Sequence, residues 1–428
     1  MKRRSVAVCA CAAVLLFTAR TALAQAALPG VVTIDQAVDE ALTHNLSLLA
    51  QRASLPVADA AVITARLRPN PVASFSADHL DLLGTGFNDV NNGGPPEIAM
   101  RVDLPIERGG KRELRAGVAT TAKDVAEADL ADTVRSLRLD VTLACIDLLQ
   151  AKGTRDLVVD TLHSFEDLAR VNDSRVAAGA IAPFEATRSR IAMLQFRSTV
   201  TKAELDVAAA TARLRLLLGR PVSAPLDIAG DLDVPGESRS LDADTLTRAA
   251  VETRPDLHSL QLQQARSTAD LRLQEANGKI DYSVGTEYRR QQGIAGKSNS
   301  LGFFVSAPLP IFSKNQGEIA RAGFEMGQET RQIEASRALI ESDVASSLHE
   351  YSVTKELVGS IERDLLAPAR SARDISSYTY KSGGTTLLEF LDAQRAFNDT
   401  MQSYVDARAG LRRAASRLNA AVGAEVVK

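Results

Sequence analysis

The sequence lacks tryptophan and has little cysteine, and aromatic side chains make up 4% of its 428 residues. Two of the three cysteines, Cys9 and Cys11, lie near the N-terminus, inside an expected leader. The remaining Cys145 can form no disulfide within the chain and cannot build a thiolate metal site alone, so we expect a small buried residue. Lys and Arg (50) nearly balance Asp and Glu (53), which argues against a nucleic-acid partner. Stability must therefore come from packing and not from disulfides.

The N-terminus has the three parts of a secretory signal peptide. Basic residues at 2–4 precede an apolar stretch at 6–19, and an Ala-Leu-Ala cleavage site ends at Ala24. About 14 apolar residues are fewer than the roughly 20 that span a bilayer, so a membrane anchor is the weaker interpretation. No Leu-x-x-Cys motif stands at the cleavage site. We expect a cleaved signal peptide at residues 1–24, export, and no lipid anchor.

Long apolar runs are absent after residue 24. Long tracts rich in Ala, Leu, Arg, Asp, Glu and Gln have instead the composition of long helices that pack against one another. If such a chain enters a membrane, it must do so as strands.

The chain repeats itself at an interval of about half its length. The segment TIDQAVDEALTHNLSLLA aligns with DADTLTRAAVETRPDLHSLQ, which pairs Leu48 with Leu257 at an offset of 209, and Gly179 aligns with Gly383 at an offset of 204. An offset that drifts by a few residues indicates one duplicated unit with small insertions. We expect a first repeat at residues 25–220 and a second at 221–428.

Each repeat contains two segments in which apolar and polar residues alternate. These segments cover about residues 70–82 and 96–105, and about 279–290 and 300–310. Ten residues is the length of a tilted strand that crosses a bilayer. The stretch that connects the two segments of each pair, QQGIAGKSNS in the second pair, is rich in Gly, Asn or Pro and predicts a loop. Clustered Phe and Tyr suit a membrane interface, but a soluble antiparallel sheet explains the strands alone equally well.

Helices dominate the rest. A helical pattern continues from about Lys111 to near Asn172, roughly 90 Å at 1.5 Å per residue. A second pattern covers Pro183 to Leu218, and a third covers Thr245 to about Ala276. Apolar residues at steps of three and four predict coiled-coil seams. We expect a mostly α fold built from a duplicated helix-strand-strand-helix unit.

Four strands per chain cannot close a membrane barrel, because about eight is the smallest closed number and open edges are not tolerated in lipid. Two chains give eight strands around a filled interior, whereas three give twelve. If these strands enter a membrane around a wet pore, three chains are expected to share one barrel.

Several motifs together resemble the TolC-like outer-membrane efflux proteins. They are RPDL beginning at Arg254, PLPIFSKNQGEIARA beginning at Pro308, and GGKRELRAG beginning at Gly109. In addition, an acidic residue follows the glycine of each helical turn by six positions. The resemblance covers essentially the whole mature chain. The motif sequences are most similar to those of the heavy-metal branch, the outer-membrane component of cobalt-zinc-cadmium exporters.

The resemblance implies a homotrimer with a twelve-stranded β-barrel in outer-membrane lipid and a long α-helical periplasmic tunnel. Its implied partners are a periplasmic adaptor (membrane fusion protein) and an inner-membrane resistance-nodulation-division pump. The implied function is a passive export duct for heavy-metal cations or other toxic small molecules, with no cofactor and no enzymatic activity.

The resemblance also implies a gate at the periplasmic tip, where acidic side chains narrow the lumen. Glu389 and Asp392 match those positions, and Glu185 is the equivalent in the first repeat. Tyr380 matches a tyrosine that helps lock the closed state, whereas Thr385 stands where an arginine would complete a salt-bridge lock. A ring of carboxylates would attract cations. By charge alone, without the resemblance, these residues are more typical of a solvated helix face.

The two helical turns are the expected adaptor contacts, through Gly179 and Ala180 in the first repeat and Gly383 and Gly384 in the second. A helical hairpin requires such glycines whether or not an adaptor binds there.

No catalytic or metal-ligand constellation emerges. GIAGKS, beginning at Gly293, lacks the first glycine of a phosphate loop, and the five histidines have no ligand spacing. The alternative to a channel is a non-channel periplasmic coiled-coil adaptor or scaffold, in which the alternating segments form a water-exposed sheet. The sequence leaves open the substrate, and which pump and adaptor the chain serves.

Overall fold

The computed structural model describes residues 30–80, 82–84, 96–233, 241–293 and 296–427, and the expected signal peptide lies outside them. The chain divides into two compact units. Unit 1 comprises Met1–Asn45, Asp140–Asp233 and Glu356–Arg413, and unit 2 comprises Leu46–Leu139, Val234–Lys355 and Ala414–Lys428. Helices α5 (Lys111–Ala177), α9 (Gln316–Ser360) and α11 (Leu387–Val422) contribute residues to both units.

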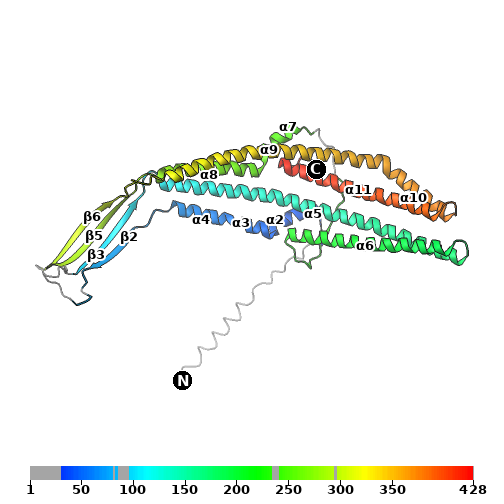
Figure 1. Cartoon of the computed structure of the whole chain (residues 1–428), viewed down its shortest axis with the longest axis horizontal. Coiled ribbons are helices and arrows are strands. Elements are labelled where there is room, and N and C mark those ends of the chain that lie inside the picture. Colours follow the sequence, from blue (N-terminus) through cyan, green and yellow to red (C-terminus); the bar gives the residue numbers. More distant parts are fainter. Residues whose placement is uncertain (1–29, 81, 85–95, 234–240, 294–295, 428) are drawn as a thin grey trace, which may run out of the picture. The chain divides into compact units, whose positions relative to one another are not determined.

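Unit 2 contains a four-stranded antiparallel sheet (Figure 1). Its strands, in spatial order, are β2 (Val72–Asp78), β3 (Glu97–Ile106), β5 (Tyr282–Gly293) and β6 (Gly296–Ser306). β3 and β5 come from opposite halves of the sequence and pair with Arg101 opposite Glu287. Within the described part of the chain, the outer strands β2 and β6 each have one edge without a strand partner.

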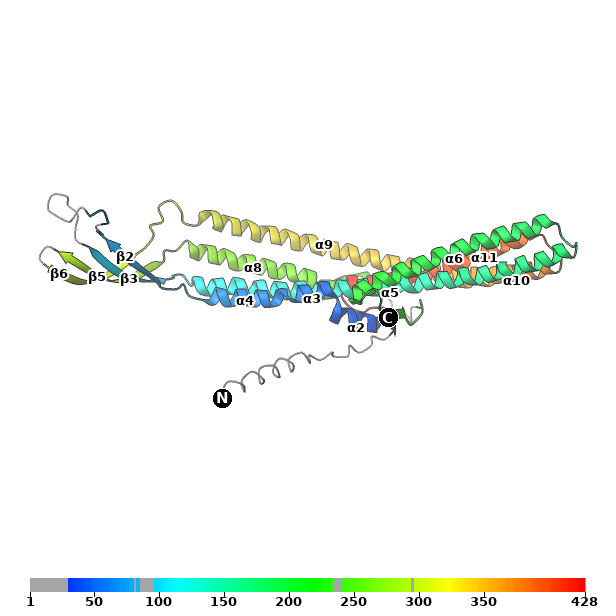
Figure 2. The same cartoon turned by 90° about the horizontal axis from the view of Figure 1, so that it is seen from below.

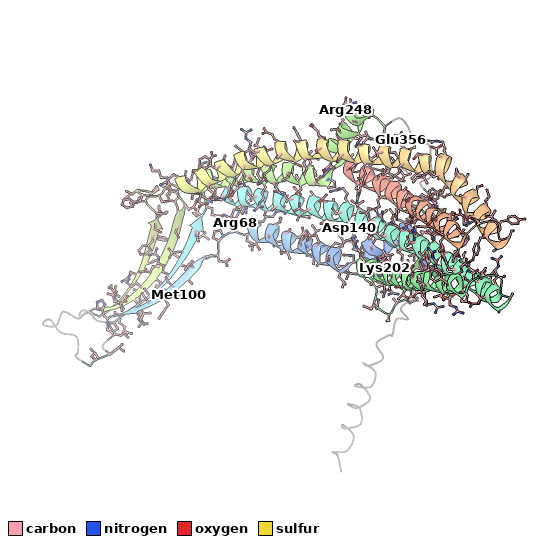
Figure 3. The ribbon with its side chains drawn as sticks, turned by 45° about the vertical axis from the view of Figure 1, so that its right-hand side comes forward. Arg68, Met100, Asp140, Lys202, Arg248 and Glu356 are labelled. Carbon is pink, nitrogen blue, oxygen red and sulfur yellow. The ribbon has the colours of Figure 1, made fainter. Side chains whose placement is uncertain are left out.

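The two faces of this sheet differ in polarity. One face, here called the apolar face, carries exposed hydrophobic side chains, among them Met100 (Figure 3). The opposite, charged face carries ion pairs: Arg101 with Asp103, and Arg289 with both Glu97 and Glu287. Alternation between an apolar and a charged face is typical of strands that lie between lipid and a water-filled lumen. The mostly helical fold with two antiparallel strand pairs is as predicted.

Two local predictions were wrong. The stretch QQGIAGKSNS was predicted to be a loop, but β5 extends to Gly293 and β6 begins at Gly296. Backbone ladder bonds require no apolar side chains, so a Gly- and Ser-rich hairpin can pair fully. The helix expected from Thr245 to about Ala276 is two helices, α7 (Ala243–Thr253) and α8 (Pro255–Asn277), because Pro255 starts a new helix at its first position.

The repeated motifs after the strands form the corners that join strands to helices in unit 2. Gly109 and Gly110 have φ of 76° and 70°, which only glycine adopts easily. The buried Lys111 then donates to the Lys279 carbonyl at 2.8 Å and to Asp281 at 2.7 Å, which joins the two repeats. At the second corner, Asn315 also has positive φ and donates to the Gln274 carbonyl at 2.8 Å.

One helical stretch in unit 2, Leu46–Arg66, is long and apolar enough to cross a membrane by length and composition, and 6% of it is buried. It consists of α3 (Leu46–Arg52) and α4 (Ser54–Arg66). Asp59 of α4 forms an ion pair with Lys123 of α5 at 2.8 Å, so α4 packs against a polar helix.

Unit 1 is a bundle of long helices with a two-stranded sheet of β1 (Val31–Val32) and β4 (Asp227–Ile228). Its remaining elements are α2 (Ile34–His44), α6 (Pro183–Leu218), a five-residue π-helix η1 (Ile361–Leu365), α10 (Leu366–Lys381), and parts of α5, α9 and α11. Figure 2 shows the α5–α6 and α10–α11 hairpins side by side. Cys145 is fully buried in this unit, as expected.

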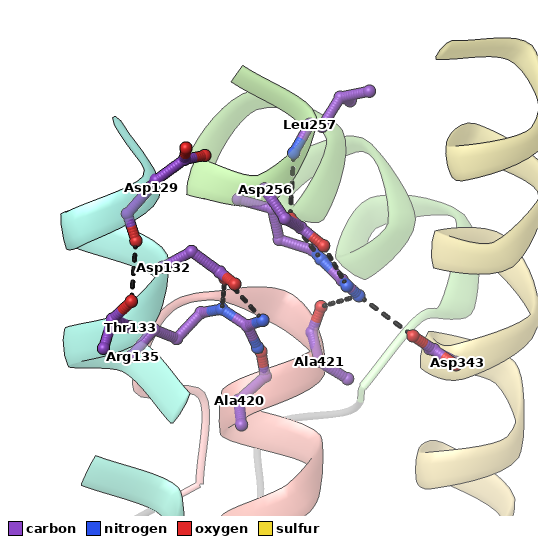
Figure 4. Close-up of polar contacts among 10 residues, drawn as sticks. Asp129, Asp132, Thr133, Arg135, Asp256, Leu257, Asp343, Ala420 and Ala421 are labelled. Atoms are coloured by element: carbon purple, nitrogen blue, oxygen red, sulfur yellow. Dashed lines mark hydrogen bonds and ion pairs between the residues drawn. The ribbon is translucent and has the colours of Figure 1, made fainter. Parts of the chain in front are cut away.

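Arginine side chains anchor the end of α11 in unit 2 (Figure 4). Arg135 donates to the Ala420 carbonyl at 3.0 Å, and Arg254 donates to the Ala421 carbonyl at 3.4 Å. Arg254 also forms ion pairs with Asp256 at 2.6 Å and with Asp343 at 3.1 Å. The last carbonyls of a helix have no partner within the helix, so these donors satisfy them. The RPDL motif is therefore a structural clamp.

We predict that Arg254→Met destabilises the protein by about 1–3 kcal/mol, because it removes the buried guanidinium that donates to the Ala421 carbonyl and pairs with the partly exposed Asp256 and Asp343 carboxylates. The measurement is the urea midpoint of the detergent-solubilised protein. Arg331→Met is the control, because Arg331 is 81% exposed and its pair with Glu334 lies on the surface, where a loss below about 1 kcal/mol is expected. Equal midpoints for both variants would contradict the clamp.

Candidate functional site: the paired helical hairpin tips

The two hairpin turns of unit 1 have the same backbone geometry. Gly179 and Gly383 have φ of 73° and 80°. The next residues, Ala180 and Gly384, each donate to a carbonyl five residues earlier, at 2.8 Å in both turns. This pattern closes a helix C-terminus through a left-handed residue, which explains the glycines predicted at both tips. These tip residues lie in exposed turns.

An apolar cluster joins the two hairpins behind the turns. Its aromatic rings are stacked, with centroids 4.6 Å apart for Phe165 and Phe196 and 5.5 Å apart for Tyr380 and Phe390. The buried members come from α5, α10 and α11, and α6 packs against them. They are Phe165, Leu168, Tyr380, Leu387 and Phe390. The cluster holds the tips of α5–α6 and α10–α11 against each other.

Tyr380 is held by residues of the opposite hairpin. It is 4% exposed, and its hydroxyl donates to the Asn172 Oδ1 at 2.8 Å. The Arg175 guanidinium lies 5.5 Å from the centroid of the Tyr380 ring and donates to the Tyr380 carbonyl at 3.3 Å. Burial raises the pKa of Tyr380, so its hydroxyl stays protonated and can donate. The tyrosine therefore fastens α10 to α5.

Asn172 and Arg175 were not among the residues predicted for this site. Asn172 is fully buried, and its Nδ2 has no hydrogen-bond partner in the described part of the chain. A buried, half-satisfied amide costs stability, so it makes this contact specific but weaker than an apolar one. A polar residue within an otherwise apolar stripe of α5 was the available signal.

Two of the acidic candidates, Glu185 and Glu389, lie in the first turns of the helices that follow the tips, and Asp392 lies further along α11. Glu389 caps its own helix: it accepts from the Thr386 amide at 2.9 Å, and its own amide donates to the Thr386 Oγ1 at 3.3 Å. The Thr385 hydroxyl also donates to Glu389. These bonds, that from Thr385 first, lower the pKa of Glu389, so the carboxylate stays ionised. Thr385, which stands where an arginine would complete a lock, thus contacts Glu389 as a neutral donor.

Asp392 is exposed on α11, and Glu185 is half-buried in the first turn of α6. Glu185 is close enough to Tyr380 to contribute to the raised pKa of the tyrosine. No group of three His, Cys, Asp or Glu residues that could hold a metal ion occurs among the described residues. Within one chain, these carboxylates therefore do not form a metal site.

We predict that Tyr380→Phe weakens the contact between the hairpins by about 1–3 kcal/mol, because it leaves the Asn172 Oδ1 buried without a donor. Hydrogen exchange of α10 amides near the tip should become faster. Replacing both partners, with Tyr380→Phe and Asn172→Leu together, should restore protection. Tyr378→Phe is the control, since Tyr378 is 74% exposed. Unchanged exchange in Tyr380→Phe would show that the hydrogen bond does not hold the tips.

Comparison with known proteins agrees with this fold. The chain is 24% identical over 394 residues, 92% of this chain and 90% of the relative, to the cobalt-zinc-cadmium resistance protein CzcC of Cupriavidus metallidurans. It is also 24% identical over 418 residues, 92% of this chain and 84% of the relative, to the pyoverdine export outer membrane protein OpmQ of Pseudomonas aeruginosa. The solved structure of CusC superposes with a TM-score of 0.76 at 17% identity, covering 92% of both chains.

A profile of the family described as outer membrane efflux protein matches residues 37–220 and 246–424. The match includes both hairpin tips and most of the described helices and strands. It is a family of channels and not of enzymes, as the sequence predicted. The chain belongs to the TolC-like outer membrane efflux protein family.

Proposed function

We propose that this efflux channel is a homotrimer and the exit duct of a tripartite system that exports heavy-metal cations. The observation that carries the proposal is the sheet of unit 2, which has one apolar face, one charged face and two free edges. An isolated sheet with free edges is not stable in lipid. Three chains, each adding four strands in the order β2-β3-β5-β6, would close a barrel of about twelve strands with the charged face inward.

The family assignment sets aside the alternative of a non-channel periplasmic adaptor or scaffold. We further propose that the signal peptide at residues 1–24 directs export, that residues 25–220 and 221–428 are structural repeats, and that the helices extend into the periplasm. The partners would be a periplasmic adaptor and a resistance-nodulation-division pump in the inner membrane.

For the substrate, we propose divalent heavy-metal cations. The cobalt-zinc-cadmium resistance relative supports this choice. The pyoverdine export relative has the same sequence identity to this chain, so identity alone does not favour a metal substrate. The tip carboxylates provide the second argument. In a trimer, three copies each of Glu185, Glu389 and Asp392 would ring the periplasmic entrance and attract cations. Tyr380 would hold that entrance closed through its bond to Asn172.

We predict that Glu389→Gln with Asp392→Asn lowers the cation preference of single channels in planar bilayers, because the entrance loses two negative charges per chain. Glutamine keeps an oxygen that can cap α11, so folding should be preserved. The control is Asp59→Asn with Glu334→Gln, an equal charge change at exposed residues of unit 2. Cation selectivity that falls equally in both double variants, or in neither, would rule out an acidic entrance.

The same tips are proposed to contact the adaptor, and cysteine crosslinking can test them. Ala180→Cys and Gly384→Cys should capture the adaptor in cells, whereas Lys202→Cys, further along α6 (Figure 3), should not. Gly384 tolerates a side chain, because an added Cβ meets only the Thr379 carbonyl oxygen and Cβ, at 3.6 and 4.0 Å. Burial raises the pKa of the native Cys145 to about 12, so it stays unreactive. Capture from Lys202 alone would overturn this assignment.

A further inference from the structure

The apolar face of the sheet changes character near the β5–β6 hairpin. Along β5, the side chains on this face are Tyr282, Val284, Thr286, Tyr288 and then Arg290. On β6 they are Lys297 and Asn299, followed by Leu301, Phe303 and Val305. The face is therefore mostly apolar, apart from Thr286, and becomes polar at the hairpin end, where Asn299 lies beside a basic pair, Arg290 and Lys297.

The basic pair differs from every arginine on the charged face. Arg101 and Arg289 are each paired with carboxylates at 2.7 to 2.9 Å. Arg290 and Lys297 are exposed and have no ion pair among the described residues. The apolar face of the described strands carries no Asp or Glu at all. Among the described residues, these two cations therefore have no anionic partner.

The geometry allows both cations to reach one anion. Arg290 lies opposite Asn299, two residues from Lys297 on the same face of β6. Such diagonal neighbours on adjacent strands are about 7–8 Å apart, within reach of two long side chains. The Tyr288 hydroxyl donates to Asn299 at 2.9 Å beside them. A tyrosine with its hydroxyl in a polar layer is typical of the interfacial girdle of a membrane barrel.

The basic pair also lies at the right depth. From Tyr282 to Arg290 a strand tilted by about 40° rises about 20 Å, close to the roughly 25 Å height of an outer-membrane apolar band. The helices are joined to the opposite ends of these strands. With those helices in the periplasm, Arg290 and Lys297 would lie at the level of the headgroups of the outer leaflet.

We propose that Arg290 and Lys297 form a binding site for the phosphate groups of an outer-leaflet lipid, the lipid A portion of lipopolysaccharide. This proposal rests on the proposed function, because it requires the apolar face to contact lipid. A guanidinium and an ammonium without carboxylate partners complement a phosphate in charge and hydrogen-bonding capacity. The apolar residues below them, such as Leu301, would contact the acyl chains of the same lipid.

The test is binding of diphosphorylated lipid A to the purified protein, titrated in detergent and counted by native mass spectrometry. Arg290→Gln with Lys297→Gln should weaken binding about 30-fold, since each cation near a membrane surface contributes about fivefold. The charge-preserving exchange, Arg290→Lys with Lys297→Arg, should retain most of the affinity. Arg68→Gln with Lys314→Gln, an equal charge change at exposed residues outside the strands, should change it little.

Three outcomes would overturn the proposal. The first is equal lipid A affinity of the wild type and the Gln double variant. The second is an equal loss in the Arg68 and Lys314 control, which would show only net charge. The third is full competition by inorganic phosphate at millimolar concentration, which would indicate a site for free phosphate. Gel electrophoresis of unheated samples distinguishes failure of the proposed function from failure of the lipid site. A missing trimer contradicts the proposed function. An intact trimer with unchanged lipid A binding in the Gln double variant contradicts only the lipid site.

Discussion

The free edges of the β2-β3-β5-β6 sheet are the constraint on which the rest of the molecule depends. Each edge presents a row of backbone donors and acceptors that lipid cannot satisfy. Under the proposed function, other copies of the chain complete the sheet, and the charged face is acceptable because completion encloses it. Ion pairs such as Arg101 with Asp103 suit that enclosed face, because they reduce the cost of charges beside a low-dielectric wall.

Joining this sheet to long helices requires two abrupt corners, and each uses a different device. The first uses two glycines with positive φ and the buried Lys111, and the second uses Asn315. Lys111, at the start of α5, bonds to the segment after α8, and Asn315, just before α9, bonds to the end of α8. These bonds fix strands and helices to each other within unit 2. Under the proposed function, a change at these corners would also misplace the edge strands β2 and β6 that pair with other copies of the chain.

Much of this fold could be predicted because its signals are local. Alternation over two residues identified all four strands, and positive-φ glycines were visible at Gly179 and Gly383. The β5–β6 hairpin was misjudged because Gly and Ser pair through the backbone without any side-chain pattern. Asn172 was missed for a different reason: its partner Tyr380 lies 208 residues away in sequence. Which buried polar residue meets which can be known only from the packing of the two hairpins.

The tip shows how the chain accommodates a threonine where an arginine would be expected. An arginine at position 385 would pair with Glu389 and cancel its charge. Thr385 and the Thr386 amide instead stabilise the ionised carboxylate with neutral donors, which lower the pKa of Glu389 without adding positive charge. The contact between the two hairpins is made instead by Tyr380 with Asn172 and with the Arg175 guanidinium. Under the proposed function, this division leaves the Glu389 carboxylate negative while the entrance is shut, because the positive charge of Arg175 lies against the ring and carbonyl of Tyr380 and not against Glu389.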